Sequence, residues 1–148
     1  MKIENTVKII KEIHNDSLIM VKAGQFHYCY GKDAVIISYL FNYVLKKIDG
    51  NYNCGFPNSA LNKIITKLEN DKINYMVVDK ADNFEIIEQD EYKANNRYSE
   101  IYSKANKYIN KKNRINEIYN YLMENINDEN IREKIIKVEE IIYEIWKI

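Results

Sequence analysis

The order of apolar segments in the N-terminal part of the chain is the feature that most constrains its fold. Apolar runs with strand character, bounded by glycine or turn residues, lie at 18–22, 26–30, 51–56, 74–78 and 83–92. Helical spacing is found instead at 4–14, 34–48 and 59–70. Strands that alternate with helices in one segment predict an α/β (α+β) fold, in which helices pack against a mixed β-sheet.

Strand signals stop at about residue 92, so we expect an α/β domain over 1–92 and a helical tail over 93–148. The tail is predicted to form helices at 95–110, 114–126 and 129–147. The last of these carries a heptad-like apolar stripe made of Ile131, Ile135, Val138, Ile142 and Ile145. The stripe spans only about two heptads, and we expect it to be buried, either within the chain or across a homodimer.

The composition is that of a chain that can bury a core. Hydrophobic residues are 46% and charged residues 30% of the 148 residues. No apolar run approaches the ~20 residues of a membrane span, and the N-terminus does not read as a secretory signal. The two cysteines, Cys29 and Cys54, are too few for a disulfide framework, so a reduced cytoplasmic setting is expected.

Positive charge is concentrated in one block, although the formal net charge is zero. Residues 93–114 hold Glu100 against seven basic residues, which are Lys93, Arg97, Lys104, Lys107, Lys111, Lys112 and Arg114. Such a block can follow a phosphate backbone. A solvated helix face explains it as well, and the acidic segment 115–148 can pair with it internally.

The stretch GQFHYCYG, residues 24–31, alternates aromatic and smaller side chains. The pleat of a strand sends Phe26, Tyr28 and Tyr30 to one face and His27 and Cys29 to the other. An aromatic stripe can stack on unpaired bases, and it can equally line a core or an interface. Because Phe26 follows a glycine bend, we expect its side chain to be at least partly exposed.

No pattern of residues predicts catalysis or a metal site. His27, Cys29 and Cys54 fall short of a zinc ligand set, and no Cys-x-x-Cys pair occurs. His14 and His27, with tyrosines and lysines, could form a ribonuclease-like acid/base set, but nothing in the sequence fixes its geometry. There is no phosphate-loop motif either. We therefore expect no catalytic residue, no metal and no cofactor.

Residues 17–80 resemble the N-terminal, mismatch-recognition domain of the MutS family of DNA mismatch repair proteins. After an apolar strand that family has Gly-Asp-Phe-Tyr-Glu, aromatic residues and an acidic pair before an alanine, where this chain reads GQFHYCYGKDA. Further on, an Ala-Gly-Val-Pro-Tyr-His-Ala segment opens a helix that leads to an apolar strand. Here that region reads CGFPNSALNKIITKLENDKINYMVVDK.

The resemblance implies a role for particular residues. Phe26 falls on the phenylalanine that is wedged beside a mispaired base from the minor groove. Tyr28 stands where the family has a glutamate that hydrogen-bonds that base, and Gln25 stands where it has an aspartate. The family's ATPase, lever and clamp domains have no counterpart in this sequence. The resemblance therefore implies a free-standing reading head without true mismatch specificity.

Two functions follow as expectations. The first is a non-enzymatic accessory protein that binds DNA or RNA while a partner performs the chemistry. Its expected contact residues are Phe26, Tyr28, Lys104, Lys107, Lys111 and Lys112. The second is a protein–protein interaction or dimerisation module that touches no nucleic acid. The feature that separates them is whether the lysines lie on the same face as Phe26.

Overall fold

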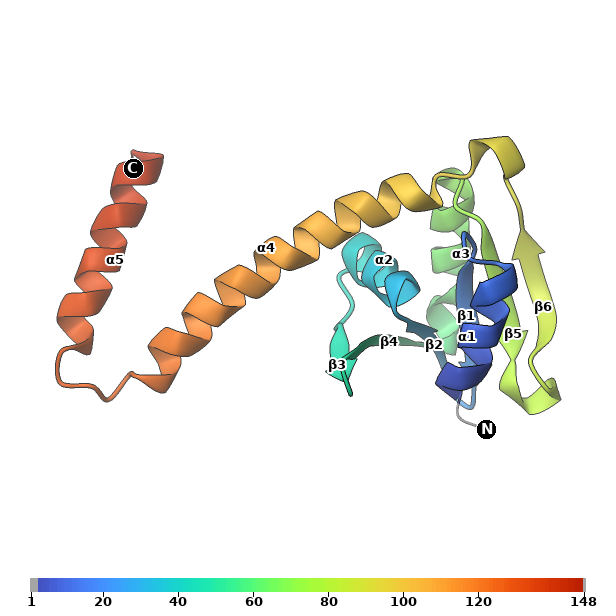
Figure 1. Ribbon diagram of the computed structural model, residues 1–148, viewed down its shortest axis with the longest axis horizontal. Coiled ribbons are helices and arrows are strands. Elements are labelled where there is room, and N and C mark those ends of the chain that lie inside the picture. The colour runs from blue at the N-terminus through green and yellow to red at the C-terminus, as the bar shows by residue number, and fades with distance from the viewer. Residues whose placement is uncertain (1–2, 148) are drawn as a thin grey trace. The chain divides into compact units, whose positions relative to one another are not determined.

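The computed structural model describes residues 3–147 and contains a six-stranded mixed sheet flanked by helices (Figure 1), which confirms the predicted fold class. Its strands are β1 (Leu18–Ala23), β2 (Phe26–Tyr30), β3 (Lys46–Ile48), β4 (Asn51–Pro57), β5 (Tyr75–Asp79) and β6 (Glu85–Asp90). Its helices are α1 (Ile3–Ile13), α2 (Lys32–Phe41), α3 (Leu61–Asn70), α4 (Tyr98–Glu124) and α5 (Ile131–Trp146). The strand order is β3-β4-β2-β1-β5-β6, with β1 and β5 parallel and the other pairs antiparallel.

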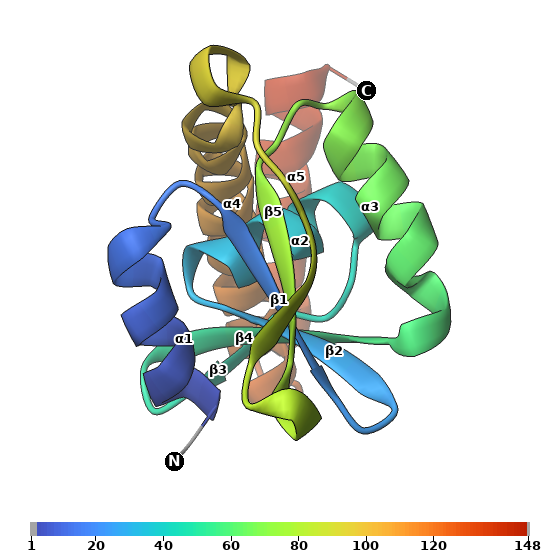
Figure 2. The same ribbon diagram turned by 90° about the vertical axis from the view of Figure 1, so that its right-hand side faces the viewer.

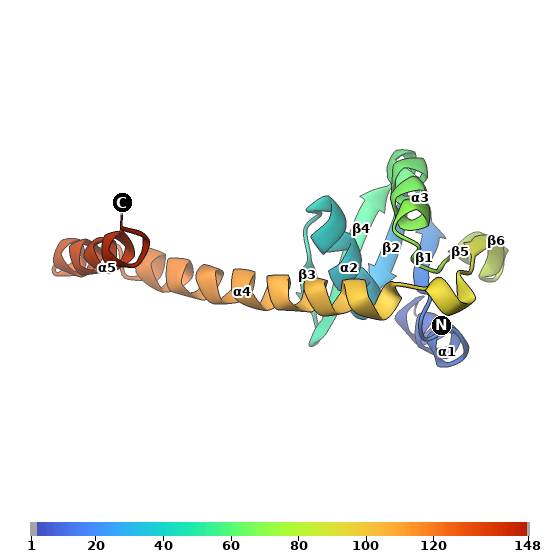
Figure 3. The same cartoon turned by 90° about the horizontal axis from the view of Figure 1, so that it is seen from above.

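Helices cover both faces of the sheet. On one face α2, α3 and the first turns of α4 bury a large cluster with Leu18, Met20 and Phe56. On the other face Val7 of α1 packs against Ile19 of β1 and its neighbours. Figures 2 and 3 show α1 and α3 on opposite sides of β1 and β5. Strand residues therefore alternate between two apolar clusters, as buried strands must.

The chain divides into two compact units between Ile109 and Asn110. The first unit therefore extends beyond residue 92, where the sequence suggested a boundary. The reason lies in the first part of α4, whose apolar face joins the core of the α/β unit through Tyr98, Ile101, Ala105 and Ile109. The second unit consists of the rest of α4 together with α5.

The helix predicted at 34–48 is shorter than expected. α2 ends at Phe41, because Asn42 takes the left-handed conformation with φ 57° and its N–H donates to Ser38 O. The Ser38 hydroxyl then donates to Tyr43 O at 2.7 Å and fixes the chain after the helix. Residues 46–48 form strand β3 instead. The end of the helix at Phe41 could not be predicted from helical spacing, because a polar residue such as Asn42 also fits the solvent-exposed face of a longer helix.

The two helices predicted at 95–110 and 114–126 are one continuous helix, α4. The segment Asn110–Asn113 that was expected to separate them contains no glycine or proline, and its residues cost a helix only a few tenths of a kcal/mol each, roughly. Helix α5 matches the third predicted helix. Among residues 3–147, no helix is both long enough and apolar enough to cross a membrane.

A buried ionic network joins four elements of the first unit. The Asp33 carboxylate accepts hydrogen bonds from the Ile19 N–H at 3.0 Å, from Lys11 Nζ at 3.0 Å and from the Tyr98 hydroxyl at 2.5 Å. Lys11 also donates to Ser17 O at 2.7 Å. Burial raises the pKa of Asp33, and the Lys11 ammonium opposes that shift. The network ties α1, β1, the start of α2 and the start of α4 together.

Candidate nucleic-acid interface

The tip of the β1–β2 hairpin is a two-residue turn, Gly24-Gln25, closed by the Ala23–Phe26 pair. Gly24 has φ +64°, the value that a type II′ turn needs at its first central residue. Asn58 holds the turn from the side: its Nδ2 donates to Gly24 O at 3.0 Å, and its backbone N–H donates to Gln25 O at 3.1 Å. The tip is therefore fixed by contacts from outside the hairpin.

Phe26 extends from this fixed tip and is 43% exposed, which confirms the predicted exposure. Its ring lies beside that of Tyr28, with centroids 6.2 Å apart. Tyr28 and Tyr30 are half-buried, whereas His27 and Cys29 are buried, so the predicted alternation of faces is confirmed. The three aromatic residues share the face of the sheet on which α1 packs, because Tyr30 contacts the α1 cluster.

Tyr28 is positioned by a glycine on the neighbouring strand. Gly55 stands opposite Tyr28 in the β2–β4 register, and a Cβ atom at residue 55 would lie 3.0 Å from Tyr28 Cε1. Glycine therefore leaves the space in which the Tyr28 ring lies. The role of Gly55 could not be predicted from the sequence, because the register of 26–30 against 51–57 depends on both segments.

A groove with a volume of about 600 Å³ lies beside these aromatic residues. Its lining residues are Ile3, Ala23, Gly24, Tyr28, Tyr30, Asn53, Lys80 and Ala81. Lys80 brings a positive charge to the aromatic face, because it follows β5 and β5 is the parallel neighbour of β1. The sequence placed Lys80 fifty residues from the hairpin and gave no signal for this proximity.

The lysines predicted to bind nucleic acid do not share the aromatic face. Lys104 and Lys107 are exposed on α4, which packs with α2 on the opposite face of the sheet. Glu100 pairs with Lys104 at 3.4 Å and with Arg97 at 2.9 Å, which offsets part of the positive block. Lys111 and Lys112 are exposed residues of the second unit. The structure therefore brings Phe26 and Tyr28 together but not Lys104 and Lys107 with them.

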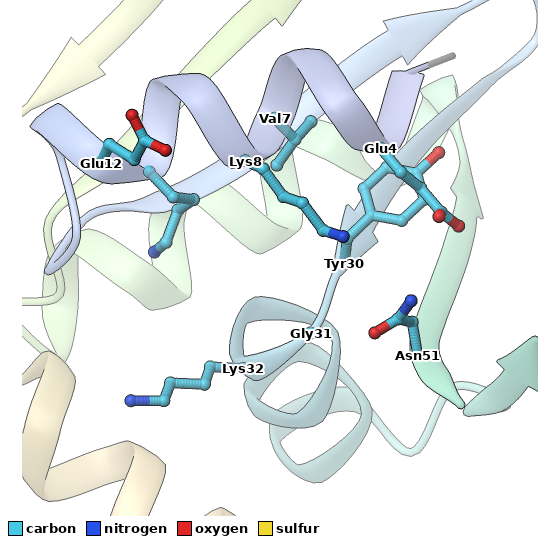
Figure 4. Close-up of a pocket in the computed structure, with 9 residues that line it drawn as sticks. Glu4, Val7, Lys8, Glu12, Tyr30, Gly31, Lys32 and Asn51 are labelled. Carbon is cyan, nitrogen blue, oxygen red and sulfur yellow. The ribbon is translucent and has the colours of Figure 1, made fainter. Parts of the chain in front are cut away.

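A second pocket, of about 330 Å³, lies between α1 and the start of α2 (Figure 4). In Figure 4 Lys8 points toward Tyr30, while Lys32 points away from it. Lys32 lies 5.1 Å from the centre of the Tyr102 ring, and Glu4 and Glu12 add negative charge to the pocket wall. Burial raises the pKa of Tyr30 to about 12, so its hydroxyl stays neutral. Opposite charges on one wall make this a weaker candidate for binding phosphate than the aromatic face.

His27 is part of the core. It is 2% exposed and stacks on Phe56 with ring centroids 5.4 Å apart, and neither ring nitrogen has a hydrogen-bond partner. Burial lowers its pKa, although the nearby Asn58 side chain opposes the shift. Burial also raises the pKa of the Cys29 thiol. Buried and uncharged, His27 has no access to a substrate, and residues 3–147 contain no group of three or more His, Cys, Asp or Glu placed to hold a metal.

The buried His27 is expected to make stability depend on pH. Its pKa is lowered in the folded chain, so below about pH 6.5 the unfolded chain binds a proton that the native chain does not. The free energy of unfolding should therefore fall by about 1 kcal/mol between pH 7.5 and pH 5.5. Urea unfolding of the wild type and His27→Phe at both pH values tests this. The variant should lose that part of the pH dependence, and equal pH dependence in both proteins would contradict it.

Comparisons with known proteins relate the chain to one family. Residues 2–113 match the family model of MutS domain I. A curated DNA mismatch repair protein MutS from Petrotoga mobilis is 36% identical over 59 residues. The aligned segment covers 40% of this chain and 7% of that protein. The chain therefore corresponds to a small part of its much longer relative.

Proposed function

The chain belongs to the MutS domain I family, and from this premise we propose that it is a DNA-binding recognition module that inserts Phe26 into the duplex. The observation that carries the proposal is the exposed Phe26 on a hairpin tip held by Asn58. An aromatic ring inserted from the minor groove can replace lost base stacking where a duplex kinks. Because the tip is already fixed, binding would order few further groups.

Tyr28 sets the expected selectivity. Its hydroxyl can form a hydrogen bond with a base, but it carries no charge where the family has a carboxylate. A charged partner strengthens a hydrogen bond about twofold over a neutral one, so the contact that reads a mispair is weaker here. We therefore propose weak binding without mismatch preference, to DNA or to RNA.

The phosphate contact nearest to Phe26 is proposed to be Lys80. It lines the same groove as Tyr28, whereas Lys104 and Lys107 extend from the opposite face. The proposed contribution of Lys104, Lys107, Lys111 and Lys112 is salt-sensitive affinity without contact at the wedge. Since no phosphate loop occurs in the sequence, the proposed role is non-enzymatic, with the chemistry left to a partner.

Changing Phe26 to alanine is expected to weaken binding at least tenfold, since stacking on one base contributes about 1–3 kcal/mol. Fluorescence anisotropy at two salt concentrations, with matched duplex, mismatched duplex, single-stranded DNA and RNA, measures the effect. The matched control is Ile87→Ala, another exposed apolar residue, on β6. Lys80→Ala should cost more affinity than Lys104→Ala.

Two results of this assay would contradict the proposal. Absence of binding to all four probes at low salt would leave the interaction module as the function. Equal affinities of the Phe26→Ala and Ile87→Ala variants for the probes would show that binding does not depend on insertion of Phe26. Strong preference for the mismatched duplex would instead refute only the proposed lack of selectivity, and would make Tyr28 a competent reader of mispairs.

The second candidate function, an interaction module, is favoured by a different observation. Large apolar side chains are exposed along the second unit, among them Ile115, Ile145 and Trp146. They lie on the helices outside the sheet and its groove, so the two functions can coexist in one chain.

A further inference from the structure

The second unit lacks a core within one chain. No residue between Asn110 and Lys147, the part of this unit that the structure describes, is fully buried. The stripe was predicted to be buried within the chain or across a homodimer. In one chain Ile131 and Val138 are half-buried, whereas Ile142 is 42% and Ile145 63% exposed, so burial across a homodimer stays a prediction. Helices of this kind draw most of their stability from packing of an apolar face. The unit therefore needs a partner surface.

The two helices of the unit leave an apolar groove between them. From the turn after Glu124 they diverge, as Figure 1 shows. The groove has a volume of about 370 Å³, and its apolar lining comes from Ile118, Tyr121 and Leu122 of α4 and from Ile131 and Val138 of α5. Two residues of the stripe thus face the groove, and the rest of the stripe continues along α5 beyond it.

Three pairs of residues in α5 are complementary when the helix is reversed about Val138. Arg132 and Glu144 lie six residues from Val138 on either side, and Lys137 and Glu139 lie one residue from it. Ile131 and Ile145 are likewise equidistant from Val138. Two copies of α5 that run in opposite directions thus place Arg132 opposite Glu144, Lys137 opposite Glu139 and Ile131 opposite Ile145.

We propose that the second unit binds a second copy of this chain, with the two α5 helices antiparallel and a twofold axis near Val138. Such an interface is isologous, so each favourable pair occurs twice. Arg132 then lies near Glu144 of the second copy, and Lys137 near Glu139. The stripe and the groove close over each other and form a four-helix bundle.

The charges favour this occupant and this direction. The first half of α5 is net basic and the second half is net acidic, so a parallel pair would place like-charged halves together. Binding to an unrelated partner would not require the three complementary pairs that α5 forms with a reversed copy of itself. The proposal goes beyond DNA binding and does not depend on it. A dimer would carry two copies of Phe26, so two recognition units could engage one duplex with raised avidity.

Sedimentation of the full chain tests the association. The wild type is expected to be a dimer, and R132E/K137E or E139K/E144K should weaken association about tenfold to a hundredfold, because attractive pairs become repulsive. An equimolar mixture of the two variants should recover the dimer. Lys104→Glu with Lys107→Glu, on the first unit, is the matched control and should leave the mass unchanged. A wild type that stays monomeric, or variants that dimerise as well as it does, would overturn the proposal.

Crosslinking tests the direction. Ile131→Cys mixed with Ile145→Cys should give a crosslinked dimer, whereas each variant alone should not. The native Cys29 and Cys54 are buried, and burial raises the pKa of both thiols, so the parent chain serves as the unreactive control. Crosslinking of Ile131→Cys with itself would show a parallel pair and overturn the antiparallel arrangement.

Discussion

Replacing Asp33 with alanine is expected to lower the free energy of unfolding by about 3–5 kcal/mol, a large part of the ~5–15 kcal/mol that stabilises a typical domain. The carboxylate is fully buried and accepts three hydrogen bonds. Its removal leaves the Ile19 N–H and the Tyr98 hydroxyl without their acceptor in the core, and the Lys11 ammonium loses its charged partner and keeps Ser17 O. Each buried polar group that loses its hydrogen-bond partner lowers the stability by the free energy of its desolvation.

Urea unfolding followed by circular dichroism measures this loss. Tyr98→Phe removes one donor and leaves two bonds to Asp33, so it should cost only about 1–2 kcal/mol. Glu100→Gln is the surface control. Its carboxylate pairs with Arg97 and Lys104 in solvent and should change stability by less than about 0.5 kcal/mol. If Asp33→Ala were as stable as Glu100→Gln, the network would not hold the fold together.

The alternation of side chains in residues 24–31 could be predicted from the sequence because it is a local property of a strand. A pleat with a period of two places Phe26 and Tyr28 together whatever the rest of the chain does. The glycine bend before Phe26 could be predicted for the same reason. The pattern of apolar segments and the family resemblance extended this local result to the order of strands and helices over residues 17–80. The structure confirms that order except for β3, which replaces the end of the helix predicted at 34–48.

The other residues of the candidate site could not be predicted from the sequence, because their positions depend on strand register and on contacts between distant segments. Gly55 meets Tyr28 through the pairing of β2 with β4, and Lys80 reaches the groove because β5 lies beside β1. Asp33 lies at the start of an apolar helix, where an acidic residue commonly caps the first turn. Burial against Lys11 and Tyr98, which stand far away in the sequence, gave it another role.

The end of the first unit is also a long-range property. Residue 92 ends the strand signals, but α4 continues the core. Hydrogen bonds also hold the backbone just before α4. The Asn96 side chain accepts hydrogen bonds from the Asn74 and Tyr98 N–H groups and donates one to Asp16 O. The start of α4 is thus part of the fold that α1 and β5 help to build.

A chain that ends at residue 92 is therefore expected not to fold, whereas one that ends at residue 113 is expected to fold. The shorter chain loses the buried side chains of Tyr98, Ile101, Ala105 and Ile109. Burial of each large one contributes about 1.5–3 kcal/mol, and the total is comparable with the ~5–15 kcal/mol of a whole domain. The shorter chain also leaves Asp33 without its Tyr98 donor. Thermal unfolding followed by circular dichroism compares the two chains.

The chain of 113 residues also separates the two proposals. It keeps Phe26, Tyr28 and Lys80 with the core that holds them, and it lacks Val138 and the stripe of α5. It should therefore be a monomer that binds one duplex through one wedge, with lower affinity than the dimeric full chain because avidity is lost. A folded chain of 92 residues would move the boundary back to where strand signals stop. A chain of 113 residues that still dimerises would place the interface on the first unit instead of on α5.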